Sequence, residues 1–368
     1  MDKVLIVNTG SASKKFALYE GGRELWRVHI EKENGDFVCA IIEPEKVEKT
    51  KISRKDFDQP VHFLRERLTG VPGAGVRVVA PGKYFLENRK IDNGFLKKLE
   101  AAEEQAPLHV APALAVIGQL RRVVPKMKLF AISDSAFYAD MPQNAKLYSL
   151  PSKVAEKFGI YRYGYHGISV SSIVGKITGN IPARVVVCHL GSGSSVVAVK
   201  NGKAFDASMG FTPLEGLPMG TRIGNIDAGA VIYLAKKTGM SPDELGAFFN
   251  QECGLLGLSG KTNDVRELLE LEKKGDAKAA QALESFVYGV KKLIGAYAAT
   301  MGGLDLLVFT ATIGERSFIM RRRICAGLEN LGVVLDDKKN NSVVSRDGFI
   351  NTSHSRVKIA VLTTNELG

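Results

Sequence analysis

Short apolar runs and longer amphipathic stretches alternate along this chain of 368 residues. Short runs of apolar or alternating residues predict strands, and apolar positions three or four apart predict helices. In the first half, the expected strands are Lys3–Asn8, Lys15–Tyr19, Glu24–Ile30, Val76–Ala80 and Lys128–Ser133. The expected helices there are Val61–Leu68, Gly94–Glu103 and Pro112–Val123. Three meandering strands followed by alternating strands and helices indicate a mixed α/β sheet.

The second half of the chain repeats this order. Strands are expected at Arg184–His189, Ser195–Lys200, Lys203–Ala207, Asp305–Thr310 and Arg356–Leu362. Helices are expected at Asp227–Lys237, Ser241–Asn250, Asn263–Lys273, Ala277–Met301 and Ser317–Leu331. The repetition predicts two similar domains with a boundary near residues 145–155, so that one covers residues 1–150 and the other residues 151–368. The junction of two such domains is a usual place for a ligand-binding cleft.

Two segments of the chain, Val4–Gly21 and Val185–Gly202, align with each other without a gap. The alignment pairs Gly10 with Gly191, Ser11 with Ser192, Ser13 with Ser194 and Gly21 with Gly202. Each copy predicts a β-hairpin with a tip of small residues. Glycine and serine also favour turns for conformational reasons alone. The ungapped second copy nevertheless favours a functional tip in each domain, because small residues let backbone N–H groups and hydroxyls approach a phosphate.

The composition is that of a globular protein with a sizeable core, since 45% of the residues are hydrophobic and 24% are charged. No stretch reaches the apolar length of a membrane span. The N-terminus begins directly with a strand pattern and has no signal-peptide pattern. The four cysteines form no Cys-x-x-Cys pair. These features predict a cytoplasmic protein with reduced thiols.

The net charge is +11, with local basic clusters at Lys46–Lys55 and Arg321–Arg323. No nucleic-acid-binding signature accompanies them. We therefore interpret the clusters as a solvated basic surface and expect neither a nucleic acid nor a membrane as partner. A positive field also favours anionic substrates.

A series of motifs resembles the acetate kinases, which belong to the sugar kinase, Hsp70 and actin superfamily. In chain order the motifs include NTGSASKKF, ISDSAFYADMP, RYGYHG, CHLGSGSS, GFTPLEGLPMGTR, TNDVR, FTATIGE and TTNE. The resemblance covers nearly the whole chain and is strongest over residues 160–266. It implies an α/β fold of two duplicated ribonuclease H-like (actin-like ATPase) domains with a central cleft. It also implies reversible transfer of a phosphoryl group from ATP to acetate, a Mg²⁺ or Mn²⁺ ion, and a homodimer.

The resemblance implies catalytic roles for two arginines, an aspartate and a histidine. These residues are Arg77, Asp134, His166 and Arg222. Guanidinium groups suit the reaction because they bind carboxylates and phosphates with paired hydrogen bonds. The structural alternatives are a surface ion pair for each arginine, a helix cap for the aspartate and a packing role for the histidine.

The resemblance also assigns binding residues. Those matching the acetate site are Arg77, Val79, Leu108 and Pro213, and those matching the metal site are Asn8 and Glu366. Those matching the phosphate and nucleotide sites are Asn8, Ser11, Ser13, Lys15, His189, Gly191, Ser192, Gly193, Asp264, Arg266, Thr312, Ile313, Gly314 and Arg316. His189 could equally support its turn. Asp264 and Arg266 could equally be a helix cap and a surface pair.

The chain departs from the family pattern in the nucleotide loop. Thr312 replaces a glycine that lies against the adenine, and Arg316 replaces an asparagine. One alternative is therefore a relative that uses propionate, butyrate or pyrophosphate. Another is a degenerate nucleotide-binding regulatory protein, suggested by the altered loops and by an end soon after TTNE. A third alternative is an actin-like or chaperone-like ATPase. Such ATPases lack an acyl-acceptor motif such as GFTPLEG, which this chain contains.

Overall fold

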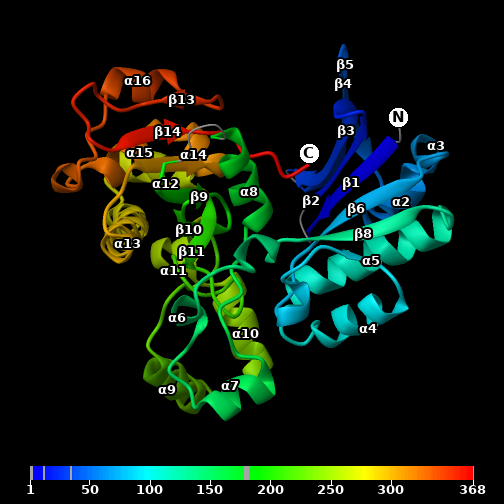
Figure 1. Cartoon of the computed structure of the whole chain (residues 1–368), viewed down its shortest axis with the longest axis horizontal. Coiled ribbons are helices and arrows are strands. Elements are labelled where there is room, and N and C mark those ends of the chain that lie inside the picture. The colour runs from blue at the N-terminus through cyan, green and yellow to red at the C-terminus, as the bar shows by residue number, and fades with distance from the viewer. Residues whose placement is uncertain (1–2, 11–12, 34, 178–181, 368) are drawn as a thin grey trace. The chain divides into compact units, whose positions relative to one another are not determined.

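The computed structural model describes residues 3–10, 13–33, 35–177 and 182–367 (Figure 1). The chain divides into two compact units. Unit 1 comprises Met1–Ala139 together with Asn365–Gly368, and unit 2 comprises Asp140–Thr364. The C-terminal segment thus returns to the first unit. The domain boundary between residues 150 and 151 stays a prediction.

Unit 1 is built on one eight-stranded mixed sheet in the order β5-β4-β3-β2-β1-β6-β8-β7. Its strands are β1 (Lys3–Thr9), β2 (Ser13–Glu20), β3 (Arg23–Glu33), β4 (Asp36–Glu43), β5 (Lys46–Ile52), β6 (Gly73–Val78), β7 (Arg89–Lys90) and β8 (Lys128–Ser133). The first five strands are antiparallel neighbours, whereas β1, β6 and β8 are parallel. The carboxyl ends of these three strands consequently lie at one edge of the sheet.

The helices of unit 1 cover this sheet and complete its core. They are α1 (Arg54–Asp58), α2 (Pro60–Phe63), α3 (Arg65–Leu68), α4 (Asn93–Ala101) and α5 (Pro107–Val123). Apolar positions three or four apart, among them Val110, Ala113 and Ile117, bury one face of α5 in the core. Pro107 at the start of α5 fits the first helical turn, where its missing N–H has no helical partner.

Unit 2 contains a six-stranded mixed sheet in the order β11-β10-β9-β12-β14-β13. Its strands are β9 (Arg184–Leu190), β10 (Ser194–Lys200), β11 (Lys203–Ala207), β12 (Leu306–Thr310), β13 (Gly348–Phe349) and β14 (Lys358–Val361). The strands β9, β12 and β14 are parallel, and β10 and β11 continue as an antiparallel meander. The central arrangement β3-β2-β1-β6-β8 of unit 1 is thus repeated as β11-β10-β9-β12-β14. The expected duplicated α/β fold is confirmed.

The helices of unit 2 include one long helix, which packs against three of the others and against the sheet. They are α6 (Gln143–Lys146), α7 (Ser152–Phe158), α8 (Gly167–Lys176), α9 (Ala228–Thr238), α10 (Pro242–Gln251), α11 (Gly254–Ser259), α12 (Val265–Lys273), α13 (Ala277–Met301), α14 (Ala311–Arg316), α15 (Phe318–Cys325) and α16 (Asp337–Ser342). The helix α13 begins after the N-cap Asp276 and ends at Gly302, whose φ of 79° suits glycine. It buries ten side chains in the core of unit 2.

Two expectations about local structure are wrong. The meander of unit 1 has five strands rather than three, because β4 and the mostly polar β5 also pair with the sheet. The stretch Ser317–Leu331 is not one helix, since α15 ends at Cys325 and the chain passes through Gly327 with a φ of 82°.

The basic cluster Arg321–Arg323 is not a uniformly solvated surface. Arg322 lies at the surface, but Arg321 is fully buried. Its guanidinium donates to the Asn340 side chain and to the backbone carbonyls of Gly314, Glu315, Asn340 and Val343. Burial lowers its pKa to about 10, so the group stays charged at neutral pH. Arg321 therefore joins the end of α14 to the end of α16.

Within the described ranges, no helix is both long and apolar enough to cross a membrane. All four cysteines are free thiols, and Cys39, Cys188 and Cys325 are buried.

Candidate functional site

Asn8, Arg77, Asp134 and Glu366 form one polar cluster in unit 1. The first three lie at the carboxyl ends of the parallel strands β1, β6 and β8, where side chains of neighbouring strands meet. Arg77 Nη2 lies 3.0 Å from Asp134 Oδ2, and its Nη1 donates to Asn8 Oδ1 at 3.1 Å. Asn8 Nδ2 donates to Glu366 Oε2 at 3.0 Å. The C-terminal segment thereby brings a carboxylate to the strand ends.

The charge of Arg77 is compensated within this cluster. Burial acts to lower its pKa, but Asp134 and Glu366 raise it above its ordinary value, so the guanidinium stays charged. Asp134 is 1% exposed and is held in an ion pair rather than at the surface. The Nε atom of Arg77 is buried without a hydrogen-bond partner in the described part of the chain. A buried donor without a partner is costly, which makes this group suited to an anionic ligand.

The oxygen atoms of this cluster fit a hard divalent cation. Mg²⁺ is usually held by one or two carboxylates together with water and substrate phosphates, and Asn8, Asp134 and Glu366 supply such oxygens. The described residues contain no group of three or more histidine, cysteine, aspartate or glutamate side chains that could hold a metal alone. The donor set therefore fits a metal shared with a phosphate ligand.

The other predicted site residues of unit 1 lie in or near β2, after β6 and at the start of α5. Lys15 in β2 is the cross-strand partner of Asn8, and Ser13 accepts from the Gly10 amide at 2.8 Å. Ser11 lies outside the described residues. Val79 follows β6 and is buried, whereas Leu108 in the first turn of α5 is 37% exposed.

In unit 2, the tip of the β9–β10 hairpin contacts two predicted catalytic side chains. A Cβ atom on Gly193 would lie 3.3 Å from His166 Nε2 and 3.5 Å from Arg222 Nη1. Glycine at this position therefore lets both groups approach the hairpin backbone closely. On the other side of the tip, Gly191 lies close to Ala311 and Thr312 at the start of α14. The hairpin thus joins the predicted phosphate-binding and nucleotide-binding loops.

His166 is held by three features of its surroundings. Its φ of 61° places it in the left-handed region as the N-cap of α8, a conformation that costs energy and is common at functional sites. Its ring stacks on His189 with centroids 4.0 Å apart, and its Nδ1 lies 3.0 Å from Ser195 Oγ. His189 in turn lies 2.8 Å from Ser169 Oγ. His189 is therefore part of the support of His166, as well as a member of the hairpin.

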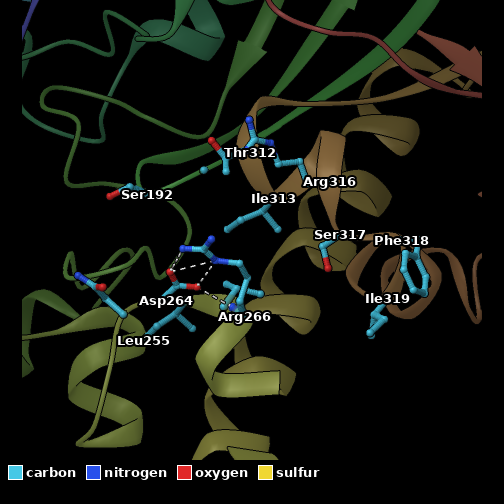
Figure 2. A pocket seen from close by; sticks show the side chains of 13 residues that line it. Ser192, Leu255, Asp264, Arg266, Thr312, Ile313, Arg316, Ser317, Phe318 and Ile319 are labelled. Carbon is cyan, nitrogen blue, oxygen red and sulfur yellow. Dashed lines mark hydrogen bonds and ion pairs between the residues drawn. The ribbon is translucent and has the colours of Figure 1, made fainter. Parts of the chain in front are cut away.

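A pocket of about 420 Å³ lies beside the hairpin tip in unit 2. This volume is within the usual range for small-molecule sites. Figure 2 shows Thr312, Ile313 and Arg316 of α14 on one wall, with Asp264 and Arg266 facing them from the start of α12. The other lining residues are Gly191, Ser192, Leu255, Asn263, Val265, Ser317, Phe318 and Ile319. Apolar side chains such as Leu255, Val265 and Phe318, together with a few polar groups, suit a planar base.

Asp264 and Arg266 line this pocket and also form a local structural pair. Asp264 is the N-cap of α12 and accepts from the Arg266 amide at 2.8 Å. The Arg266 guanidinium binds the same carboxylate, and this hydrogen bond lowers the pKa of Asp264 below its ordinary value. The Arg266 side chain is 87% exposed, so it can turn toward a ligand. The capping role is thus present together with the pocket position.

On α14, Thr312 and Arg316 are four residues apart and share one helix face. Both are exposed and both line the pocket. Gly314 is buried instead, and a Cβ there would lie 3.3 Å from the Phe309 backbone. Gly314 therefore serves the packing of α14 rather than the pocket wall.

The model of the acetokinase family matches residues 3–367 of this chain. The chain belongs to this family. An acetate kinase from Bacillus cytotoxicus is 39% identical over 387 residues, which cover 100% of this chain and 96% of that protein. A crystal structure of Porphyromonas gingivalis acetate kinase has 32% identity and a TM-score of 0.87, covering 100% of this chain and 97% of that one. A Francisella tularensis propionate kinase has 36% identity and a TM-score of 0.90, with the same coverage.

This acetokinase family member contains further polar residues that the sequence analysis did not single out. Glu315 Oε1 accepts from the amides of Ala311 at 2.9 Å and Thr364 at 3.0 Å. Thr364 Oγ1 donates to Ser169 Oγ at 2.8 Å, and the same Ser169 hydroxyl lies 2.8 Å from His189 Nδ1. Thr364 is therefore connected to His189 through Ser169. Only the position of Glu315 within FTATIGE and of Thr364 within TTNE could have suggested them. The contact of Glu315 with Thr364 and that of Thr364 with Ser169 join positions far apart in sequence and become visible only in the fold.

Proposed function

We propose that this protein is an acetate kinase, which reversibly transfers the γ-phosphoryl group of ATP to a carboxylate oxygen of acetate. Its full-length similarity to proteins named acetate kinase carries this proposal. We propose that it acts in the cytoplasm. The products are acetyl phosphate and ADP, and the new P–O bond forms as the bond to the leaving ADP oxygen breaks.

The chemistry needs positioning and charge neutralisation more than covalent help from the protein. We propose that Arg77 binds the acetate carboxylate and that Val79, Leu108 and Pro213 contact its methyl group. His166 and Arg222 lie beside the Gly193 tip. We propose that both stabilise negative charge on the transferring group. Asp134 holds the Arg77 guanidinium in place.

For the donor, we propose that ATP occupies the pocket of unit 2 with its base between α12 and α14. The small tips with Ser11, Ser13 and Lys15 and with Gly191, Ser192 and Gly193 bind its phosphates, with His189 supporting the second tip. Asn8 and Glu366 would hold Mg²⁺ or Mn²⁺, which supplies neutralisation of phosphate charge when bound.

A coupled assay for acyl phosphate tests this function. Acetate, propionate and butyrate are each combined with ATP, GTP and pyrophosphate in the presence of Mg²⁺. We expect turnover with acetate and ATP that is abolished by a chelator. Binding of ATP without turnover of any acid would contradict the proposal and favour a regulatory protein instead.

Propionate is the second candidate acceptor, because a propionate kinase is among the similar structures. One methylene in an apolar pocket is worth only about 1–3 kcal/mol, so a single pocket can accept both acids. The ratio of kcat/KM for the two acids in the same assay decides between them.

We predict that Thr312→Gly lowers the KM for ATP about fivefold. Thr312 is exposed on the pocket wall, and crowding of a bound base by a branched side chain costs about 1 kcal/mol. Initial rates at saturating acetate measure the effect. Thr312→Ser, which removes only the methyl group, should show an intermediate value. Equal KM values for ATP in all three proteins, with no turnover of pyrophosphate, would show that the crowding idea is wrong.

We also propose that the protein is a homodimer that buries α9. This helix has the sequence AGAVIYLAKKT, in which the first eight residues are apolar or small. None of its 11 residues is buried, and Ile232 and Tyr233 are 56% and 64% exposed. A helix with an uncovered apolar face needs a partner, and a second copy of the chain supplies one.

Light scattering at micromolar protein should give twice the chain mass. The double substitution Ile232→Arg, Tyr233→Asp should give a monomer, whereas Val47→Lys on the exposed strand β5 should not. A monomeric parent protein would refute the dimer.

A further inference from the structure

The loop between β11 and α9 contains a turn from Phe211 to Glu215 that includes Pro213. Both ends of this turn form a hydrogen bond with the same hydroxyl group. Tyr148 Oη accepts a hydrogen bond from the Phe211 amide at 2.9 Å. The same hydroxyl donates to Oε2 of the Glu215 carboxylate. Since Pro213 lies midway between Phe211 and Glu215, a single side chain from outside the loop closes the turn that presents Pro213.

Arg162 supports this connection from a second direction. Its Nε and Nη2 atoms donate to Glu215 Oε1 at 3.1 and 2.7 Å, and its guanidinium carbon lies 4.7 Å from the Tyr148 ring centroid. The carboxylate charge is thus compensated, and the arginine is held over the aromatic face. Tyr148, Arg162 and Glu215 form what we call the loop brace.

The hydroxyl of Tyr148 keeps its proton in this environment. Burial raises its pKa, and the hydrogen bond and charge of Glu215 raise it further above the ordinary value. The hydroxyl therefore donates to Glu215 throughout the neutral range, and its oxygen remains available to the Phe211 amide.

The loop lies closely against the brace and is connected to a predicted catalytic side chain. A Cβ atom on Gly210 would overlap Glu215 Oε2 and Tyr148 Oη, so a larger residue there would displace the brace. The Phe211 carbonyl accepts from Tyr165 Oη at 2.7 Å. The Pro213 carbonyl accepts from Arg222 Nη1 at 3.3 Å. A shift of the loop therefore moves both the apolar contact at Pro213 and the guanidinium of Arg222.

We propose that Tyr148, together with Glu215 and Arg162, is a positioning residue for the acyl acceptor, and that the brace sets acceptor affinity and chain-length preference by fixing Pro213 and Arg222. This inference rests on the proposed acyl kinase function. The brace touches the loop backbone rather than the reacting atoms, so its effect should fall on the acceptor and leave donor binding unchanged.

Tyr148→Phe tests the inference, because it removes the bridging hydroxyl and keeps the ring under Arg162. We expect the KM for acetate to rise about tenfold, the KM for ATP to change less than about twofold, and the ratio of kcat/KM for propionate over acetate to rise. Amide hydrogen exchange gives a readout that needs no substrate. The Phe211 amide should lose its protection in this variant.

Tyr163→Phe is the matched control. Tyr163 is a buried tyrosine whose hydroxyl donates to the Gly159 carbonyl at the end of α7. Loss of this hydroxyl should leave both KM values, the acceptor ratio and the protection of the Phe211 amide unchanged.

An unchanged KM for acetate and unchanged protection of Phe211 in Tyr148→Phe would overturn the inference. Equal increases in the KM values for acetate and ATP would also overturn it, because they would indicate general loosening. A parent protein that phosphorylates no short-chain acid contradicts the proposed function and the acceptor role together, and the exchange data then still report whether the brace orders the loop.

Discussion

Replacing Arg77 by alanine is expected to lower kcat for acetyl phosphate formation at least a hundredfold. A hundredfold loss corresponds to about 2.7 kcal/mol of transition-state stabilisation, which is within the range for removal of one electrostatic contact. The guanidinium also holds Asp134 and Asn8, so its loss disturbs the polar cluster as well as the proposed acceptor site. Steady-state rates with acetate and ATP measure the effect, and a thermal unfolding curve shows that the variant is folded.

Arg222→Ala should give a loss of similar size from unit 2, because this guanidinium lies beside the Gly193 tip. Arg54→Ala is the control, since Arg54 is exposed and forms a surface ion pair with Asp58 one helical turn away. Its rate should equal that of the parent protein. Normal turnover in Arg77→Ala or Arg222→Ala would remove that arginine from the catalytic assignment.

Replacing Arg321 by methionine is expected to lower the free energy of unfolding by about 3–5 kcal/mol. The substitution keeps much of the side-chain length but leaves the carbonyls of Gly314, Asn340 and Val343 without their buried donor. Each buried polar group without a partner costs about 1–3 kcal/mol, and partial relaxation reduces the sum. Urea unfolding of parent and variant measures the difference.

Arg322→Met is the matched control from the same helix. Arg322 is 47% exposed and binds the exposed Asp337 at 2.7 Å, so its loss should change the free energy of unfolding by less than about 1 kcal/mol. Arg321→Lys should not rescue stability, because a single ammonium group cannot reach acceptors on both α14 and α16 as the planar guanidinium does. Equal stability of the Arg321→Met and Arg322→Met variants would show that the buried contacts of Arg321 contribute little.

Elements with long, regular patterns were predictable from the sequence. The helix α13 was expected at Ala277–Met301 and is found there, because its apolar positions recur at helical spacing and Asp276 and Gly302 provide caps. The strand β5 was missed because its exposed, charged residues show no apolar alternation, and the pairing with β4 alone makes it a strand. The short helix α14 was missed because six residues are too few for a periodic signal.

The sequence determined by itself which chemical groups this protein contains and that its two halves share one plan. The repeated Gly-Ser segments and the order of the motifs were sufficient for both conclusions, because they depend on local composition and spacing. Only the tertiary structure decided which groups meet. Asp134 reaches Arg77 because β6 and β8 are parallel neighbours, and Glu366 reaches Asn8 across 358 positions because the C-terminal segment returns to unit 1.

The three consecutive arginines Arg321, Arg322 and Arg323 show the same division most clearly. The sequence determined that three positive charges follow one another, but three identical residue types carry no information on burial. In α15, successive residues point about 100° apart around the helix axis. Arg321 therefore faces the carbonyls of α14 and α16, while Arg322 binds Asp337 at the surface and Arg323 binds Glu272. Burial depends on the direction of each side chain relative to neighbouring elements, and that direction exists only once the chain has folded.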